Sequence, residues 1–146
     1  MEFDDILTAL ALAQTRFVIT GGVAAVFHGY RRPVADLDLV VDLAAPDSGQ
    51  RAAACLGTLG FVPTIPLPLN AVVVMRWLDQ NGREVDLNVR YPISFADLET
   101  RSHAFPVGGH LVRVISLADL VSVKTARARD YDVTDVAALR ELHRID

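Results

Sequence analysis

The feature that most constrains this chain is a glycine pair, Gly21-Gly22, followed by two aspartates one position apart, Asp36 and Asp38. The aspartates lie in an apolar run that ends at Val41. In an extended strand, residues i and i+2 point to the same face and lie roughly 6.5–7 Å apart. The run therefore predicts a strand over 36–41 that presents both carboxylates on one face and apolar side chains on the other.

Two carboxylates held this close repel each other, which a protein tolerates when a cation neutralises them or when one acid stays protonated. Carboxylate oxygens are hard ligands that suit Mg²⁺, with Mn²⁺ as the alternative, and the sequence has no Cys/His spacing typical of zinc sites. Asp86 is the predicted third carboxylate, and Glu84 on the same strand face competes for that role. If segment 83–89 lies beside 36–41, the acids converge as metal-dependent phosphoryl transfer requires.

The glycine pair lies between a short apolar strand, predicted over 16–20, and a helical stretch predicted over 23–29. Glycines at such a turn let backbone N–H groups approach phosphate oxygens closely, and a helix N-terminus adds partial positive charge. A nucleoside triphosphate (NTP) is therefore the predicted guest beside the acids.

The order of these motifs resembles the DNA polymerase β-type nucleotidyltransferase superfamily. Within it, the small bacterial AbiEii-like and minimal nucleotidyltransferases are the most similar. The residues that carry the resemblance are the glycine pair Gly21-Gly22, the run Asp36-Leu-Asp38-Leu, and the later Val-Asp86-Leu.

Two further segments extend the resemblance to roughly half of the chain. Family members often carry Arg-x-Thr-x-Asp before the acid pair; this chain keeps Arg32 but has Val34 in place of the threonine. Segments 114–124 and 129–139 resemble the family's strand, its helix bearing a lysine, and an Arg/Asp-containing turn into a last helix. Lys124 is the lysine of that helix and the only lysine in the sequence.

The resemblance implies an α+β nucleotidyltransferase (polymerase β-like) fold, with a mixed or antiparallel sheet flanked by helices and with helices at the C-terminus. It implies Mg²⁺-dependent transfer of a nucleoside monophosphate from an NTP to an acceptor hydroxyl on RNA such as a tRNA end, on a protein or on a small molecule. A toxin role with a cognate antitoxin is also implied. The implied catalytic and metal-binding residues are Asp36, Asp38 and Asp86, and the implied nucleotide-binding residues are Gly21, Gly22, Arg32 and Lys124.

Two other classes of function use the same residues. A non-catalytic module that keeps the fold and the metal site, acting as a toxin–antitoxin partner, would bind Mg²⁺ and an NTP without turnover. A metal-dependent phosphohydrolase would release nucleotide without an acceptor, but such enzymes usually use histidine ligands, which this site lacks.

Length and composition predict one compact domain over 1–146, with a core at 16–115 and a C-terminal helical part at 116–146. The sequence has no apolar run of about 18 residues, and its acidic start is unlike a signal peptide. We therefore expect no membrane association and a cytoplasmic location. A net charge of −4 argues against tight, non-specific nucleic-acid binding. Cys55 has no disulfide partner within the chain and is predicted to be a small core residue.

Periodicity and turn residues predict the other elements. Asn81-Gly82 between two strand-like runs indicates a hairpin. Ser116 is predicted to cap the helix that runs through Lys124, with Asp119 in the capping-box position. The other predicted helices cover 3–14, 46–60, 94–101 and 132–143, and the other predicted strands cover 71–78, 83–89, 103–107 and 111–115.

Arg127 and Arg129 follow Lys124 closely, so the three form a basic group that could meet phosphates. Structural roles are predicted for other polar and aromatic residues: packing rather than base stacking for the aromatics, and N-terminal helix charges for the acids of the last helix. These residues are His28, Trp77, Tyr91, Asp130, Asp132 and Asp135.

Overall fold

A computed structural model of the protein describes residues 2–44 and 48–145. Helices and strands alternate irregularly along the chain, as in an α+β protein. The elements are α1 (Asp4–Leu12), β1 (Phe17–Thr20), α2 (Gly21–Phe27), β2 (Asp36–Val41), α3 (Ser48–Thr58), β3 (Val62–Pro63), the 3₁₀ helix η1 (Leu69–Ala71), β4 (Val74–Leu78), β5 (Glu84–Asn88), α4 (Phe95–Arg101), β6 (His103–Val107), β7 (His110–Val114), α5 (Leu117–Arg127) and α6 (Asp130–His143).

One mixed sheet organises the fold, with the strand order β3-β4-β5-β2-β1-β7-β6. β2 runs parallel to β5, and β1 runs parallel to β7. The other neighbouring strands are antiparallel. The α+β class with a mixed sheet flanked by helices is therefore confirmed. The strand that carries Asp86 lies directly beside the strand that carries Asp36 and Asp38, as the convergence of the acids requires.

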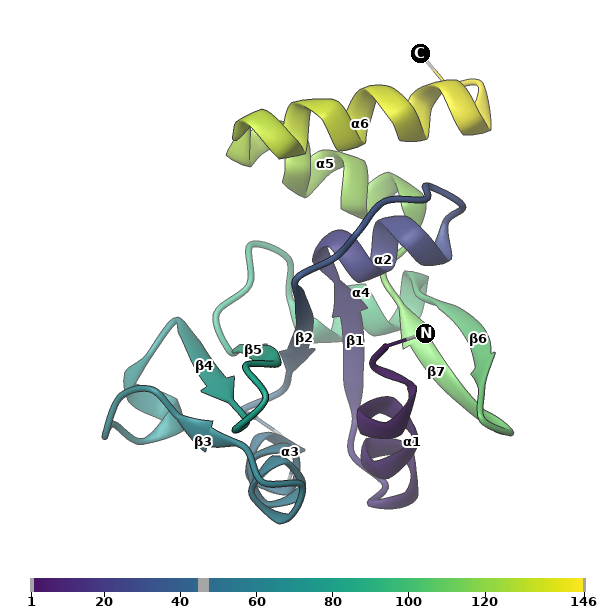
Figure 1. The fold of residues 1–146 in the computed structure, drawn as a ribbon. Coiled ribbons are helices and arrows are strands. Elements are labelled where there is room, and N and C mark those ends of the chain that lie inside the picture. The colour runs from purple at the N-terminus through teal and green to yellow at the C-terminus, as the bar shows by residue number, and fades with distance from the viewer. Residues whose placement is uncertain (1, 45–47, 146) are drawn as a thin grey trace.

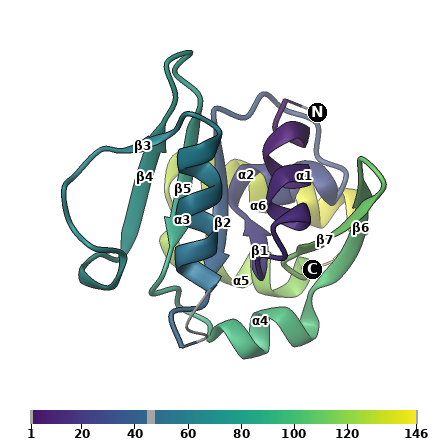
Figure 2. The same cartoon turned by 90° about the horizontal axis from the view of Figure 1, so that it is seen from below.

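The two faces of β2 have different surroundings. Leu37 and Leu39 are fully buried in the core, together with residues of α1 and α3. Those two helices lie side by side in front of the strands when the molecule is viewed from below (Figure 2). α5 and α6 stack on each other at the opposite end, beyond α2 (Figure 1). The C-terminal helices therefore lie on the other side of α2 from α1 and α3, near the ends of β1 and β2.

Most predicted elements are present with small shifts at their ends. Ser94 and Ser116 cap α4 and α5 by accepting hydrogen bonds from backbone N–H groups, as predicted for Ser116. The predicted helix over 3–14 is shorter, because α1 ends at Leu12. Pro46, where the helix over 46–60 was predicted to begin, lies outside the described residues, and the described part of α3 covers Ser48–Thr58.

Three boundaries were predicted wrongly. α2 begins at Gly21 itself, so the glycines form its first turn instead of preceding it. The strand predicted over 71–78 begins only at Val74, because Leu69–Ala71 form a 3₁₀ turn after Pro68, whose backbone is fixed in an extended conformation. The last helix begins at Asp130, because the Asp132 carboxylate accepts a hydrogen bond from the backbone N–H of Arg129, the residue before the first turn.

Within the parts of the chain that the structure describes, every helix is too short or too polar to span a lipid bilayer.

Candidate active site

The carboxylates come together because β2 and β5 pair in parallel. The register places Asp38 opposite Asp86 and Asp36 opposite Glu84. Neighbouring strands lie about 4.8 Å apart, so side chains on one face of such a pair lie close together. One carboxylate oxygen from each of Asp36, Asp38 and Asp86 lies within 4.8 Å of the other two. The structure thus brings these three predicted acids into one group.

Burial and mutual repulsion make the acid group costly in the absence of a cation. Burial, followed by the charges of Asp36 and Asp86, raises the pKa of Asp38 to about 7. Burial also raises the pKa values of Asp36 and Asp86, whose carboxyls share a hydrogen bond. Three hard oxygen donors at this separation fit a divalent cation such as Mg²⁺, whose charge would remove the repulsion.

This repulsion gives the metal-free protein a specific pH dependence. The pKa of Asp38 is higher in the folded state than its ordinary value of 3.8, so its ionisation destabilises the fold. The penalty is absent below pH 4, develops as the pH rises to about 7, and is at most about 4 kcal/mol. We expect Asp38→Asn to raise the free energy of unfolding at pH 7.5 but not at pH 4, as measured by urea denaturation in EDTA. Addition of Mg²⁺ should stabilise the wild type more than the variant. If Asp38→Asn changes the free energy of unfolding equally at pH 4 and pH 7.5, this account is contradicted.

The glycine pair packs directly on the acids. Thr20 pairs with Asp38 across β1 and β2, so the chain enters α2 beside that carboxylate. Gly21 adopts a φ of +66°, and a side chain there would collide with the Asp38 carboxylate. A Cβ at Gly22 would lie 2.7 Å from an Arg32 guanidinium nitrogen and 3.1 Å from a Val34 methyl carbon. Gly21 therefore requires the absence of a side chain, whereas a side chain at Gly22 would displace the Arg32 guanidinium and crowd Val34.

Gly21→Ala should consequently destabilise the protein by more than the usual cost of a left-handed alanine, about 1–2 kcal/mol, because it adds a collision to an unfavourable φ. Gly57→Ala is the matched control, since Gly57 lies within α3 and an added Cβ would meet nothing within 4 Å. That control should gain about 0.5–1 kcal/mol. Thermal unfolding of both variants tests the pair; a Gly21→Ala protein as stable as the wild type would show that the turn does not need glycine.

The predicted nucleotide contacts Arg32 and Lys124 take part in a buried ion-pair network. Arg32 donates two hydrogen bonds of 2.8 Å to the Asp135 carboxylate. The Lys124 ammonium, on a residue only 2% exposed, lies 2.8 Å from Asp135 and 3.4 Å from Asp132. Arg129 donates to Asp132 at 2.9 Å. The network connects α5, α6 and the segment that leads into β2.

The role predicted for Asp135 is corrected by this network. Asp132 lies in the first turn of α6, as predicted, but Asp135 does not, and both are buried. Burial alone would raise the pKa of Asp135, but its hydrogen bonds with Arg32 and Lys124 hold that pKa below its ordinary value. Asp135 is therefore the ionised centre of the network and not a solvated helix charge.

A pocket of about 320 Å³ contains the acid pair. Gly21, Gly22 and the segment 32–35 form one part of its lining, and residues of α5 and α6 form another. Arg127 lies 5.6 Å over the ring of Tyr91, and Tyr91 shares a 2.6 Å hydrogen bond with the Thr20 hydroxyl. From the C-terminal helices the lining includes Lys124, Arg127, Arg129 and Tyr131. Every predicted site residue except Asp86 therefore lines this one pocket.

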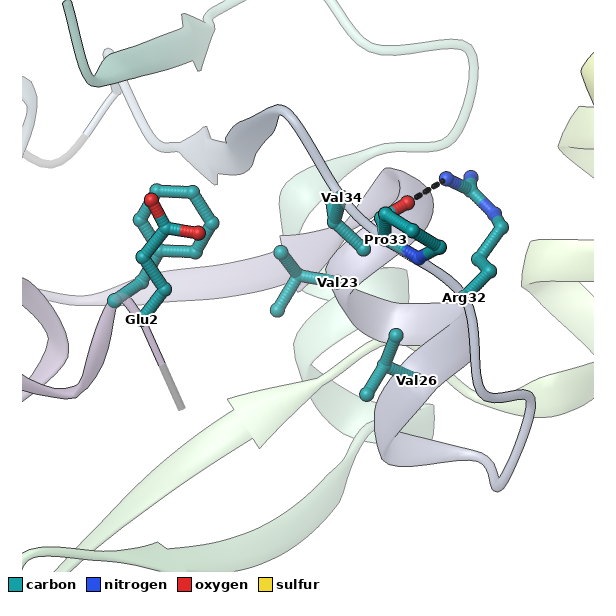
Figure 3. Close-up of a pocket in the computed structure, with 7 residues that line it drawn as sticks. Glu2, Val23, Val26, Arg32, Pro33 and Val34 are labelled. Carbon is teal, nitrogen blue, oxygen red and sulfur yellow. Dashed lines mark hydrogen bonds between the residues drawn. The ribbon is translucent and has the colours of Figure 1, made fainter.

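A neighbouring pocket of about 230 Å³ shares Arg32, Pro33 and Val34 with the first. Figure 3 shows its apolar wall, with Val23 and Val26 on α2 and the Arg32 side chain directed away from Glu2. The Arg32 guanidinium also donates to the Pro33 carbonyl oxygen at 3.0 Å. This pocket contains no part of the acid group, so the candidate site is the larger one.

Sequence reasoning missed Arg76, which lies at the acid group from β4. Its Nε lies 3.1 Å from Glu84 and 3.3 Å from Asp86. Glu84, the other candidate for the third carboxylate, is thus paired with the Arg76 guanidinium. His28 has the predicted structural role, because its Nε2 hydrogen-bonds the Ile115 carbonyl oxygen at 2.7 Å.

No protein-family model matches the sequence, and no curated protein matches it at a significant level. Solved structures do match. The lincosamide antibiotic adenylyltransferase LnuA, bound to lincomycin, superposes with a TM-score of 0.72 at 15% identity, covering 95% of this chain and 94% of LnuA. ANT(2")-Ia in complex with adenylyl-2"-tobramycin gives a TM-score of 0.62 at 15% identity, covering 93% and 84%. An antigenic nucleotidyltransferase-like protein from Paracoccidioides brasiliensis gives 0.62 at 16%, covering 97% and 74%.

These structures superpose on nearly the whole of this chain, and their sequences are 14–16% identical to it. At that level of identity they establish the fold. They confirm the fold class predicted from the glycine pair and the acids, and the AbiEii-like subtype stays a prediction.

Proposed function

This chain has the polymerase β-like nucleotidyltransferase fold, and we propose that it transfers a nucleoside monophosphate from an NTP to an acceptor hydroxyl. The observation that carries the proposal is the group of three carboxylates next to a glycine turn in which Gly21 has no room for a side chain. In the reaction, the acceptor oxygen forms a bond to the α-phosphorus, the bond from that phosphorus to the bridging oxygen breaks, and pyrophosphate leaves.

The residues have separate tasks in this proposal. A bound Mg²⁺, held by Asp36, Asp38 and Asp86, would supply charge neutralisation for the triphosphate and a lowered pKa for the acceptor hydroxyl. Asp86 takes the proton of that hydroxyl as general base. The backbone N–H groups of Gly21 and Gly22 bind phosphate oxygens, since no side chain keeps the phosphates away from them.

Cations on the other side of the pocket balance the leaving pyrophosphate. Arg127 and Arg129 line the pocket and are exposed, but Arg129 is paired with Asp132, and Lys124 and Arg32 are engaged with Asp135. We therefore assign the largest direct contribution to Arg127, whose charge acts on Asp38. Lys124 and Arg32 contribute positive charge from within the ion-pair network.

A small-molecule hydroxyl is the proposed acceptor, because the matched structures of LnuA and ANT(2")-Ia contain lincomycin and adenylyl-2"-tobramycin, and LnuA matches over nearly its full length. RNA and protein acceptors, a toxin role and a cognate antitoxin stay predictions. The alternative is a non-catalytic module, which the experiment must distinguish from an active nucleotidyltransferase.

Each α-³²P-labelled NTP should be incubated with the protein and Mg²⁺ in the presence of lincomycin, tobramycin, total RNA or a cell lysate. Transfer of label to any acceptor, absent from Asp86→Asn protein, supports the proposal. Binding of the NTP in calorimetry without transfer to any acceptor would favour the non-catalytic module, and release of free nucleotide without an acceptor would favour a phosphohydrolase.

A further inference from the structure

Tyr131 is an exposed aromatic residue in the pocket that contains the acid pair. It belongs to the first turn of α6, and it is 50% exposed. Among the described residues that line this pocket, Tyr131 is the only aromatic one. A half-exposed aromatic ring in a pocket otherwise lined by glycines, charges and small apolar residues offers a flat apolar face to a planar ligand.

The other aromatic candidates near the site are already engaged. Tyr91 is partly buried and is bound to Thr20 through its hydroxyl. Trp77 is buried in the core. Neither lines the pocket. Tyr131 is therefore the aromatic side chain that a pocket ligand can reach.

Two cations hold the Tyr131 ring in place. The Arg129 guanidinium lies 4.6 Å from the ring centroid, and the Lys124 ammonium lies 5.9 Å from it. Both cations are fixed in turn by Asp132, which is fully buried. Because the ring is positioned before a ligand arrives, little side-chain freedom is lost when a planar group packs on it.

The ring lies on α6 beside Arg129, whereas the leaving pyrophosphate is assigned chiefly to Arg127 on α5. The triphosphate is assigned to the turn at Gly21-Gly22 and to the acids, and Tyr131 comes from α6, which contributes a different part of the lining. Tyr131, the glycine pair and the acid pair line one pocket, so the two ends belong to one continuous site. Pro33, Val34 and Ala35 add apolar surface to the same pocket.

We propose that Tyr131 is the surface on which the base of the bound nucleotide stacks, and that it thereby positions the nucleotide in the site. This inference rests on the proposed function, because it places the base of the same NTP. Stacking of a base on an aromatic side chain typically contributes about 1–3 kcal/mol by alanine substitution. Tyr131→Ala should therefore weaken nucleotide binding by about 5- to 150-fold.

Two probes separate the base from the phosphates: α,β-methylene-ATP, which carries both and is not turned over, and inorganic tripolyphosphate, which carries no base. Calorimetry in Mg²⁺ should show that Tyr131→Ala weakens binding of the nucleotide and leaves binding of tripolyphosphate within twofold of the wild type. Tyr131→Phe, which keeps the ring, should bind both probes as the wild type does. Val133→Ala is the matched control, since Val133 is exposed on the same helix and does not line the pocket.

Several outcomes would overturn the inference. If Tyr131→Ala binds the nucleotide as tightly as the wild type, the base does not contact this ring. If Tyr131→Ala loses both probes equally while its thermal unfolding is unchanged, Tyr131 acts on the phosphates. Should the alanine variant fail to fold, Tyr131→Leu fills the position without an aromatic ring, and the same comparison applies. Wild-type protein that binds neither probe overturns the proposed function as well, which distinguishes that failure from the failure of the stacking role alone.

Discussion

Asp86→Asn is expected to reduce nucleotide transfer by about 10²–10⁴-fold while leaving the fold intact. The asparagine is almost the same size and keeps an oxygen in the group, but it cannot take the proton of the acceptor hydroxyl and is a weaker ligand for a hard cation. The same change removes one of three crowded acids, whose pKa values are all raised. We therefore expect the metal-free variant to be more stable than the wild type at pH 7.5. Single-turnover kinetics with the best acceptor and urea denaturation in EDTA measure the two effects.

Glu84→Gln is the matched control for Asp86→Asn. Glu84 lies on the same strand face two residues earlier, opposite Asp36, and pairs with Arg76. It is outside the acid group whose oxygens converge, so this variant should keep its transfer rate within a few-fold of the wild type. If Glu84→Gln abolishes transfer and Asp86→Asn does not, the competitor named from the sequence is the catalytic acid and the assignment of Asp86 is wrong.

The acid group could be predicted because it depends on short-range rules. The two-residue period of a strand fixes which side chains of 36–41 share a face, and the same period applies to 84–88. That segment 83–89 lies beside 36–41 was a condition of the prediction, and the structure supplies the parallel pairing of β2 with β5. Local pattern and resemblance together therefore located the acids.

Arg76 was missed because its position depends on the register of one hairpin. A two-residue turn at Asn81-Gly82 would pair Trp77 with Asp86. The structure instead has a three-residue loop, with Gly82 at a φ of +79°, so that Leu78 pairs with Glu84 and Arg76 pairs with Asp86. A shift of one residue in this loop exchanges the two faces of β4. The conformation of the loop at Gly82 thus decides whether the Arg76 guanidinium or the Trp77 indole ring faces the acids.

The ion-pair network could not be predicted, because its members are distant in sequence. Arg32 and Asp135 are separated by 103 positions. Charged residues on a helix ordinarily indicate a solvent-exposed face, so a buried lysine on α5 and a buried aspartate on α6 have no local signal. Their burial follows only from the packing of α5 on α6 and of both over the segment before β2. The same packing brings Tyr131 into the pocket.

Lys124→Met is expected to lower the free energy of unfolding by about 3–5 kcal/mol. The substitution keeps most of the side-chain volume but removes the cation that lies between two buried carboxylates. Asp132 and Asp135 would then face each other with only Arg129 and Arg32 at their outer sides. Because breaking one side of a buried ion pair leaves an uncompensated charge, the loss should be larger than for an exposed pair. Urea denaturation at pH 7.5 gives the difference directly.

Arg101→Gln provides the comparison, because it breaks the Arg101–Asp119 pair, whose arginine side chain is half exposed. That variant should lose far less stability than Lys124→Met, because water screens an exposed pair. The double variant Lys124→Met/Asp132→Asn should recover part of the stability lost in Lys124→Met, since one of the two facing charges is gone. A Lys124→Met protein that unfolds like the wild type but no longer binds tripolyphosphate would show instead that the ammonium serves the nucleotide and not the fold. If Lys124→Met loses stability but still binds tripolyphosphate, Lys124 stabilises the packing of α5 against α6, and Arg127 is the residue that binds the phosphates.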